Sequence, residues 1–445
     1  MKLLQMLQKA LATSAVGRNN TAMQPTLRDL TRVFARIGIL SFGGPAAQIA
    51  MMHREVVDRH AWVNEKDYLS ALSFCMLLPG PEAMQLATWI GWRTHGTLGG
   101  LIAGGLFVLP GALVVLALSA IYVTLGALPL VAALFAGVQA AVVVVVIEAL
   151  LRVSHRALKG RVERLLALGA FVALFALALP FPIVVLAAAV LGALSLSKNS
   201  QNPQTPTRGP SWAQSLGTAG LWLAIWLLPL ALLWALEGGI LTEIGLYFSK
   251  LALLTFGGAY AVLAWMVQEV VQIQGWLTTA QMMDGLGLAE TTQGPLILVT
   301  EFVGFVAGWH AGGWALALAG AFVALWMTFA PCFLWIFLGA PHIARLTAQP
   351  RLAGALAGIM AAVVGVIANL SLWFALHVFF DSRTLFSAGP IQLMLPDATS
   401  LRFAPLIIAL GAGYLLLRRH WSLPLVLAIA ALGSVALGAV TGGLI

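Results

Sequence analysis

The sequence predicts an all-α polytopic membrane protein, with about 13 transmembrane helices forming two inverted-topology repeats that contain broken helices. Three observations support this fold class. Hydrophobic residues make up 60% of the 445 residues and charged residues only 9%, which excludes a soluble globular protein. The length leaves room for about a dozen spans of roughly 20 residues each. Finally, one motif occurs in both halves, within an apolar segment each time.

Apolar segments separated by polar, glycine or proline positions give the expected spans in order. In the first half they lie at 28–52, 69–93, 97–123, 127–150, 163–180 and 181–197. A connecting span at 214–236 is followed by 245–269, 280–309, 312–339, 352–380, 402–418 and 421–443. The segments 163–180 and 181–197 meet around Pro180-Phe181-Pro182. They could instead form one kinked passage or a re-entrant hairpin.

These spans divide the chain into five parts. They are a cytoplasmic N-terminal segment (1–27), a first transporter repeat (28–197), a polar cytoplasmic linker (198–213), a connecting transmembrane helix (214–236) and a second repeat (237–445). Because six spans and the connecting helix precede the second copy, that copy should enter the membrane from the opposite side. The Lys and Arg distribution places the N-terminus in the cytoplasm and the C-terminus in the periplasm of a bacterial inner membrane. The first 25 residues contain no removable signal peptide pattern.

The repeated motif is Ser41-Phe42-Gly43-Gly44-Pro45, which returns 214 positions later as Thr255-Phe256-Gly257-Gly258. The same offset pairs Glu55 with Glu269, Trp62 with Trp276, and Gly80-Pro81 with Gly294-Pro295. Paired glycines and proline interrupt a helix, and lipid cannot satisfy the freed backbone groups. Such breaks are tolerated where they line a cavity or are packed inside protein. The pattern therefore predicts a substrate site at the interface of the repeats.

A second break, Pro79-Gly80-Pro81-Glu82, begins a half-helix whose free N–H groups could bind an anion. Carboxylates within spans are expensive, so Glu82, Glu290 and Glu301 are expected to carry protons or to pair with a buried arginine. Glu82 could instead only cap the half-helix. Arg54 and Glu55 end the first broken helix, where they could serve the transported ion or form a plain ion pair.

These arguments give two sets of candidate residues. The expected substrate-binding residues are Ser41, Phe42, Gly43, Gly44, Pro45, Gln48, Arg54, Gly80, Pro81, Gln85, Thr255, Gly257, Gly258, Thr292 and Gln293. The expected proton-coupling or gating residues are Glu55, Glu82, Glu269, Glu290 and Glu301.

The remaining charged residues and the two cysteines are expected to have structural roles. Arg36 either faces the cavity or extends to the cytoplasmic surface, and the second is favoured. Glu148 and Arg152 have the spacing of an intrahelical ion pair. Cys75 and Cys332 are expected to be inert packing residues. No His, Asp or Glu cluster has metal-ligand spacing, so neither a metal nor another cofactor is predicted.

The motif set resembles that of the chromate ion transporter family in its long, two-domain form. The residues that carry the resemblance are Phe34 to Gly38, Ser41 to Pro45, His53-Arg54-Glu55, Trp62 and Pro79-Gly80-Pro81, and the similarity extends from Thr31 to about Trp309. It implies efflux of chromate from the bacterial cytoplasm, conferring resistance and driven by proton-motive force or membrane potential. In the second half Ala259 replaces Pro45, Gln268 replaces Arg54, and Leu296 replaces Glu82. The first half is thus expected to carry most of the anion binding.

The candidate residues were also compared with the requirements of other functions. Chromate and sulfate are both tetrahedral oxyanions that need N–H donors and a cation, so a transporter for sulfate remains an alternative. An anion channel fits asymmetric repeats less well than alternating access does. Neither a nucleophile elbow nor a zinc-protease helix supports an enzyme, and no basic stripe with aromatics supports nucleic-acid binding. The expected partners are the transported ion and membrane lipid, and a homodimer is left open.

Overall fold

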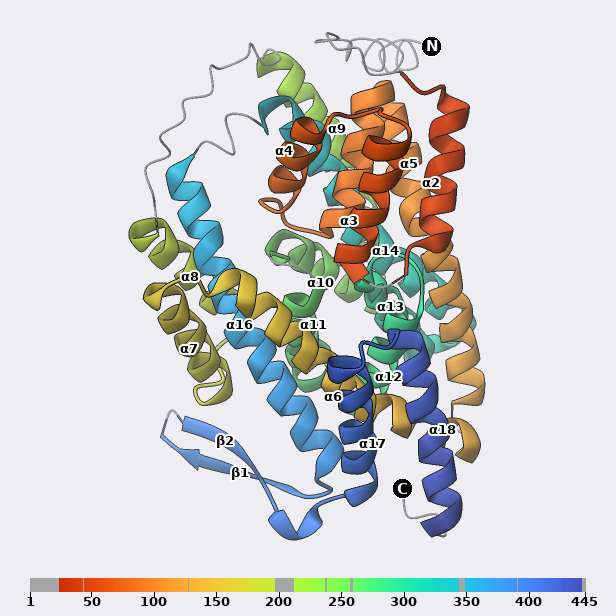
Figure 1. Cartoon of the computed structure of the whole chain (residues 1–445), viewed down its shortest axis with the longest axis vertical. Helices are drawn as coiled ribbons and strands as arrows, with labels where there is room; N and C mark the ends of the chain where they lie inside the picture. Colours follow the sequence, from red (N-terminus) through yellow and green to blue (C-terminus); the bar gives the residue numbers. More distant parts are fainter. Residues whose placement is uncertain are drawn as a thin grey trace.

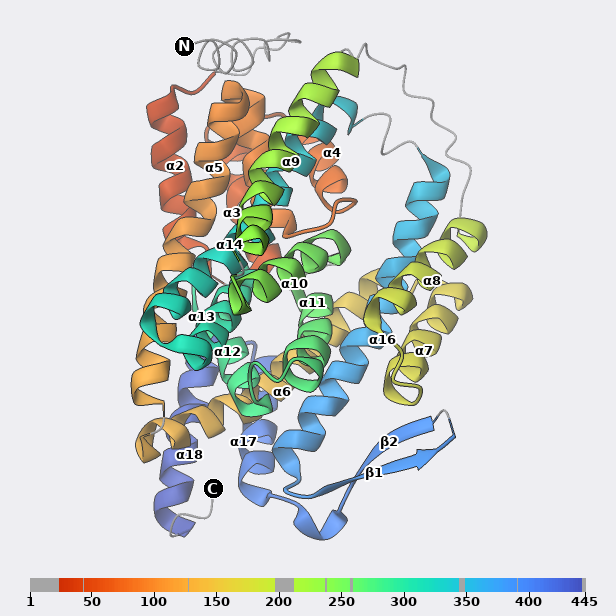
Figure 2. The same cartoon turned by 180° about the vertical axis from the view of Figure 1, so that it is seen from behind.

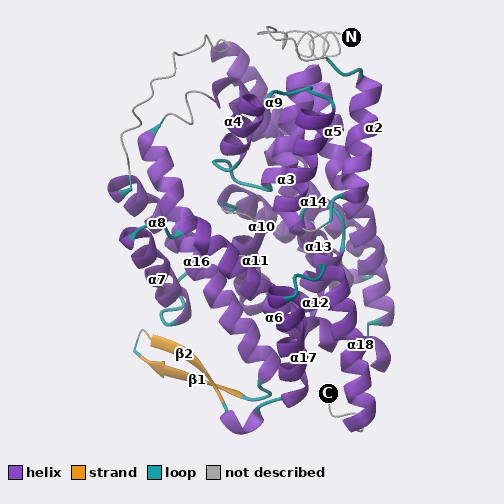
Figure 3. Ribbon diagram, in the orientation of Figure 1, coloured by secondary structure: helices purple, strands orange, loops and turns teal. Residues whose placement is uncertain are grey.

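The computed structural model describes residues 24–42, 44–126, 128–196, 212–236, 238–256, 259–343, 349–389 and 391–441, and these are nearly all helical (Figure 3). Gly43, Gly257 and Gly258 of the predicted site lie outside the described residues. Most helices are grouped in one bundle (Figure 1), whose core combines side chains from both halves of the sequence.

The first half contains α2 (Leu27–Leu40), α3 (Gly44–His53), the π-helix η1 (Arg54–Arg59), α4 (Glu65–Cys75), α5 (Glu82–Leu125), α6 (Pro129–Ala157), α7 (Arg161–Phe175) and α8 (Phe181–Ser195). After α9 (Trp212–Ala235) come α10 (Ile240–Leu254), α11 (Ala259–Met266), the π-helix η2 (Val267–Ile273), α12 (Thr279–Thr291), the short η3 (Leu296–Leu298), α13 (Val299–Gly312) and α14 (Trp314–Gly339). The chain ends with η4 (Ala340–His342), α16 (Pro350–Phe379), β1 (Arg383–Ala388), β2 (Ile391–Pro396), η5 (Ala398–Ser400), α17 (Phe403–Gly413), η6 (Tyr414–Arg418) and α18 (Leu423–Thr441).

Several helices are long and apolar enough to cross a membrane. Within the described residues there are six, at Glu82–Leu125, Pro129–Ala157, Ser215–Ala235, Trp314–His342, Pro350–Phe379 and Leu423–Val440. Shorter apolar helices include Phe181–Ser195 and Phe403–Arg418. This makes the chain a polytopic membrane protein, whereas the expected number of about 13 spans stays a prediction.

The predicted breaks are present, but the chain reverses at the first of them. Segment 28–52, expected as one interrupted span, forms α2 and α3 as two short helices, and α3 turns back toward the end where α2 begins (Figures 1 and 2). Segment 69–93 is divided between α4 and the first part of α5, which has a kink at His95 and Gly96. Segments 245–269 and 280–309 are each divided among three elements, namely α10, α11 and η2, and α12, η3 and α13. Gly44, with φ of 78°, supplies the left-handed conformation at the first turn. The two glycines and the proline interrupt the helix, so the chain after α2 can continue in several directions. Packing against the rest of the bundle then decides its direction.

Positions 214 apart adopt the same local structure. The N–H of Phe42 donates to Leu40 (2.9 Å) as that of Phe256 does to Leu254 (3.0 Å). The N–H groups of Trp62 and Trp276 donate to the carbonyls of Val56 and Val270, at 2.8 and 2.9 Å. Both halves also pass through a π-helix directly after the broken helix. The sequence repeat is therefore a repeat of backbone conformation as well.

Each half packs its long helix against the last two helices of the other half. α6 lies against α17 and α18, and α16 lies against α7 and α8 (Figure 1). Glycine permits these approaches: a Cβ at Gly137 would lie 2.1 Å from the carbonyl oxygen of Ala430, and one at Gly192 would lie 2.4 Å from that of Gly354. The segments 163–180 and 181–197, whose arrangement was open, form the separate helices α7 and α8.

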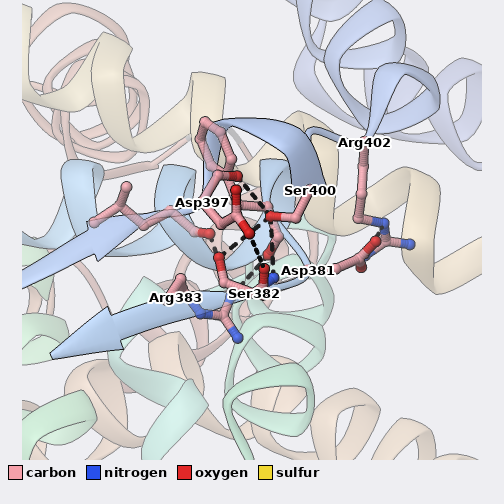
Figure 4. Close-up of polar contacts among 8 residues, drawn as sticks. Asp381, Ser382, Arg383, Asp397, Ser400 and Arg402 are labelled. Atoms are coloured by element: carbon pink, nitrogen blue, oxygen red, sulfur yellow. Dashed lines mark hydrogen bonds and ion pairs between the residues drawn. The ribbon is translucent and has the colours of Figure 1, made fainter.

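The expectation of an all-α fold was wrong in one place, because β1 and β2 pair as an antiparallel hairpin between α16 and α17. Its base is closed by polar contacts (Figure 4). The Asp397 carboxylate accepts from the N–H of Thr399 at 2.9 Å, and the Ser400 hydroxyl donates to the Ser382 carbonyl at 3.2 Å. Arg402 and Asp381 form an ion pair at 3.4 Å. The sequence analysis had assigned this stretch only to the connection between the spans 352–380 and 402–418.

Candidate functional site

The four helix breaks meet in reciprocal pairs inside the bundle. The N–H of Gly294, in the second half, donates to the carbonyl of Ser41 at 3.0 Å. The N–H of Gly80, in the first half, donates to the carbonyl of Thr255 at 2.8 Å. Because Ser41 and Gly80 correspond to Thr255 and Gly294 at the same offset of 214, the two bonds are equivalent. We call these four residues the crossing.

Gln48 joins both halves at the crossing. Its side chain is 1% exposed, and its amide nitrogen donates to the carbonyls of Gly294 (2.6 Å) and Ser41 (3.2 Å). This satisfies backbone carbonyls that the interrupted helices leave free. The Gln48 amide oxygen and the Ser41 hydroxyl are buried without a hydrogen-bond partner. Buried polar atoms without partners are costly, which identifies this point as a place for a ligand or water.

Gln85 occupies a comparable place beside the second break. Its side chain is fully buried, and its amide nitrogen donates to the carbonyl of Pro79 at 2.7 Å while its oxygen has no partner. Gly80, with φ of 122°, brings the backbone against this amide: an added Cβ would lie 2.8 Å from the Gln85 nitrogen. Pro81 caps α5. Thr292 is buried, but its hydroxyl donates to the carbonyl of Ala289.

The side chains of three predicted binding residues make no hydrogen bond to the crossing. The Phe42 side chain is 44% exposed, and the Gln293 amide reaches the carbonyl of Pro110 at 3.4 Å. Arg54 follows α3 and lines a separate pocket with Arg36. Six helical residues separate Arg54 from Gln48, a rise of about 9 Å. The structure therefore does not bring Arg54 to the crossing.

The predicted carboxylates have different surroundings. Glu55 pairs with Arg59 at 3.4 Å, while Glu269 accepts from the amide of Gln274 at 3.1 Å. Glu301 is 1% exposed and one of its oxygens has no hydrogen-bond partner. Glu55 and Glu269 are thus held in local contacts, whereas Glu301 is isolated within the helix bundle.

Glu82 and Glu290 lie within electrostatic reach of α6. The Glu290 carboxylate accepts from the hydroxyl of Tyr260 at 2.7 Å and interacts with the Arg152 guanidinium. Glu82 interacts in the same way with Arg156. Arg152 also forms the expected ion pair with Glu148. A tetrahedral oxyanion requires cations, and these two arginines lie within Coulombic range of Glu290 and Glu82 without forming an ion pair with either.

Sequence reasoning gave Arg152 and Arg156 no role in binding, because it placed both on the cytoplasmic side and assigned Arg152 only to an intrahelical ion pair with Glu148. Glu148, Arg152 and Arg156 recur every fourth residue, which places them on one helical face. That spacing was the available signal, and it fits α6 continuing to Ala157.

A second missed group is a buried carboxylate in α12. Asp284 is 5% exposed and accepts from the Tyr122 hydroxyl and from the Gln139 amide, both at 2.8 Å. These contacts join α5, α6 and α12. The rule that singles out carboxylates within apolar spans would have found Asp284.

A histidine at the end of α3 connects this helix with α4. The Nε2 atom of His53 lies 2.6 Å from the Glu65 carboxylate, and Nδ1 lies 3.4 Å from that of Asp58. The hydrogen bond to Glu65 raises the pKa of His53, with a smaller contribution from Asp58. The Tyr68 ring packs edge-on against this imidazole, and its hydroxyl donates to the carbonyl of Ile49. α4 is thereby held against α3.

Within the described ranges, no three His, Cys, Asp or Glu side chains gather as metal ligands. Cys75 and Cys332 are buried, as expected. The site therefore consists of backbone groups, amides, a hydroxyl, carboxylates and guanidinium groups, which suit the binding of an ion.

Comparison with known proteins gives a consistent result over both halves. The model of the chromate transporter family matches residues 28–193 and 242–436. A chromate transport protein of Cupriavidus metallidurans is 31% identical over 84% of this chain and 88% of its own length. One from Pseudomonas aeruginosa is 33% identical over 75% of this chain and 77% of its own length, and a probable one from Synechococcus elongatus is 29% identical over 87% and 94%. No solved structure matches significantly.

Proposed function

The chain belongs to the chromate transporter family, and on that premise we propose that it exports chromate from the cytoplasm across the bacterial inner membrane. The crossing is the observation that carries this proposal. Two equivalent hydrogen bonds join the halves where four helices are interrupted, which is the arrangement expected at a transporter's substrate site. Export of this kind would confer chromate resistance.

The proposed mechanism is alternating access between two inverted-topology repeats, 28–197 and 237–445, joined by the linker 198–213 and the connecting helix. Matching backbone conformations at positions 214 apart support the repeat. The N-terminus lies in the cytoplasm and the C-terminus in the periplasm in this proposal. Each state would keep one side of the crossing closed while the other opens.

Binding is assigned mainly to the first half. The Ser41 hydroxyl is a buried donor without a partner, and Arg152 and Arg156 supply positive charge near Glu290 and Glu82. The corresponding second-half residues of Gln48 and Gln85 are Val262 and Val299, which cannot form these hydrogen bonds. The polar contacts at the crossing are therefore asymmetric, although its backbone is repeated.

Membrane potential alone favours the export of a dianion from a negative-inside cell, by roughly 2.3 kcal/mol per charge per 100 mV. Proton coupling would add to this driving force through Glu82, Glu290 or Glu301. Of these, Glu301 is the most isolated from hydrogen-bond partners. A carboxyl that is protonated in one state and released in the other would couple the two ions.

The test is uptake of radiolabelled chromate by inverted membrane vesicles from cells that express the chain, compared with vector vesicles. We expect saturable uptake that persists with excess sulfate and increases with an imposed pH gradient. Uptake at the vector level would contradict the proposal. Uptake that excess sulfate abolishes would favour the alternative, a transporter for tetrahedral oxyanions in general.

A further inference from the structure

A cationic pocket lies between α2 and η1, apart from the crossing. It has a volume of about 300 Å³, and three of its lining residues are the arginines Arg36, Arg54 and Arg59. Glu55 is its one carboxylate among the lining residues, and Ile37, Leu40 and Met51 make the apolar part of its wall. At about 30 Å³ per water molecule, this volume would hold a tetrahedral ion with part of its hydration.

The charges in this pocket do not balance. Glu55 is engaged by Arg59 at 3.4 Å and lies 3.7 Å from His60. Among the described residues, neither Arg36 nor Arg54 forms an ion pair. Two guanidinium groups thus remain available beside a third, and guanidinium groups bind tetrahedral oxyanions through paired, charge-assisted hydrogen bonds. All three arginines are exposed, so the pocket is open to solvent and its excess positive charge favours an anion.

The second half does not repeat this pocket. The residues that correspond to Arg36, Arg54 and Arg59 are Lys250, Gln268 and Ile273. Gln268 is instead used in packing, because its side-chain oxygen accepts from the N–H of Phe181 at the start of α8, at 3.2 Å. The second half adopts the repeated fold without these three arginines, so the fold itself does not require them.

We propose that Arg36, Arg54 and Arg59 form an outer binding site for a tetrahedral oxyanion, which captures the ion before it reaches the crossing. The inference rests on the proposed function, in which the N-terminal end of α2 is cytoplasmic. α3 runs back toward that end of the molecule (Figure 1), and η1 follows α3 directly. The outer site then faces the compartment from which chromate is exported, and its positive charge raises the local concentration of dianions.

A phospholipid headgroup has the same recognition chemistry as a free oxyanion, and the apolar wall of the pocket could also accommodate part of an acyl chain. Varying the lipid composition of the membrane distinguishes a bound headgroup from a bound free oxyanion. In nanodiscs of phosphatidylcholine alone, a free oxyanion can occupy the pocket. With added phosphatidylglycerol, an anionic lipid that prefers the pocket would displace it.

The experiment measures equilibrium binding of radiolabelled chromate to the full chain in phosphatidylcholine nanodiscs. We expect two ions per wild-type chain, and one for the double variant Arg36→Gln/Arg54→Gln. Arg28→Gln is the matched control, because Arg28 lies on the same helix, eight residues before Arg36 and outside the pocket. Wild-type binding of a single ion, or equal binding by the double variant and the control, would overturn the outer site.

Transport provides the second readout. The double variant should raise the Michaelis constant for chromate about tenfold, the size expected for losing charge-assisted hydrogen bonds, and leave the maximal rate nearly unchanged. The difference from the control should shrink at high salt, which screens capture by charge. A lowered maximal rate with an unchanged Michaelis constant would contradict a capture role. Failure of export itself would appear differently, as normal binding of two ions without vesicle uptake.

Adding phosphatidylglycerol identifies the source of the oxyanion. If the outer ion is lost only when this lipid is present, the headgroup phosphate occupies the pocket in anionic membranes. If two chromate ions still bind, the site serves the free ion. The second result supports capture of chromate by the three arginines, whereas the first would overturn capture and leave a site for lipid headgroups.

Discussion

Gln48 shows how one side chain can hold the crossing together. Its amide serves one carbonyl from each half, and Val262 at the corresponding second-half position cannot do the same. Replacing Gln48 by leucine keeps the approximate size and removes both hydrogen bonds. The Gly294 carbonyl would then be left without its donor, which costs roughly 1–3 kcal/mol for a buried group, whereas the Ser41 carbonyl keeps the N–H of Gly294.

We therefore expect Gln48→Leu to lower the initial rate of chromate uptake in vesicles by about tenfold or more. Gln293→Leu is the matched control, since the Gln293 amide makes only a long 3.4 Å contact with Pro110. Equal rates for the two variants, at equal expression, would show that the Gln48 bonds do not matter for transport.

Glu301 permits a test of proton coupling at a single carboxyl group. Glu301→Gln keeps the shape of the side chain and removes its ability to gain or lose a proton. Uptake driven by membrane potential should persist, whereas stimulation by a pH gradient should disappear. Glu163→Gln, at the exposed start of α7, is the control. Undiminished pH stimulation in Glu301→Gln would transfer the proposed coupling to Glu82 or Glu290.

At this scale, sequence predicted residue types better than their contacts. Ser41, Gln48, Gly80 and Thr255 were placed together because a motif repeats, and the structure brings Gln48 to Ser41 and Gly80 to Thr255. Arg54 was placed with them because it is a cation near the same motif, yet it lies in another pocket. A residue's distance from the motif in the sequence does not determine on which side of the turn between α2 and α3 its side chain lies. The packing of the helices determines it.

Among the elements, the link between α3 and α4 should depend on pH, because it is made by His53 and Glu65. Glu65 raises the pKa of His53, so the imidazole holds its proton more tightly in the folded protein than in the unfolded chain. This contribution to stability is complete below the ordinary histidine pKa of about 6.5 and is lost as pH rises through the raised value. For a pair this exposed it amounts to no more than roughly 1 kcal/mol.

We expect the wild-type melting temperature in nanodiscs to fall between about pH 6 and pH 8 by more than that of His53→Gln. Comparing the two proteins isolates His53 from other groups that titrate in this range. Glu65→Gln should resemble His53→Gln, since it removes the main cause of the pKa shift. Parallel pH profiles for all three proteins would rule out this link as a source of pH dependence.

The sequence predicted where helices break more successfully than how they continue. Gly44 and Pro45 weaken the helix wherever they occur, so the break can be read directly. Whether the chain then kinks or reverses depends on distant partners, such as the contact of Gly294 with Ser41. The β1–β2 hairpin was missed for a related reason. Its apolar residues fit a strand or a helix, and the contacts of Asp397 and Ser400 that close its base come from residues after the second strand.

For the whole molecule, the exchanged packing of long helices has a consequence for assembly. α6 of the first half has its neighbours α17 and α18 in the second, and α16 has α7 and α8 in the first. Gly137 and Gly192 allow backbones of different halves to approach closely. Neither half can bury these helix faces by itself, so each half should require the other to fold.

The chain divided within the linker 198–211 should therefore reassemble. We expect the two fragments, expressed together, to purify as a complex through a tag on either one and to restore vesicle uptake of chromate. Each fragment expressed alone should aggregate in detergent, because the face of α6 around Gly137, or of α16 around Gly354, lacks its partner. Gly137→Leu should prevent reassembly by separating α6 from α18, whereas Gly169→Leu, at a glycine with open space around it, should not. A first fragment that is monodisperse alone and unfolds cooperatively would show instead that the halves are independent domains.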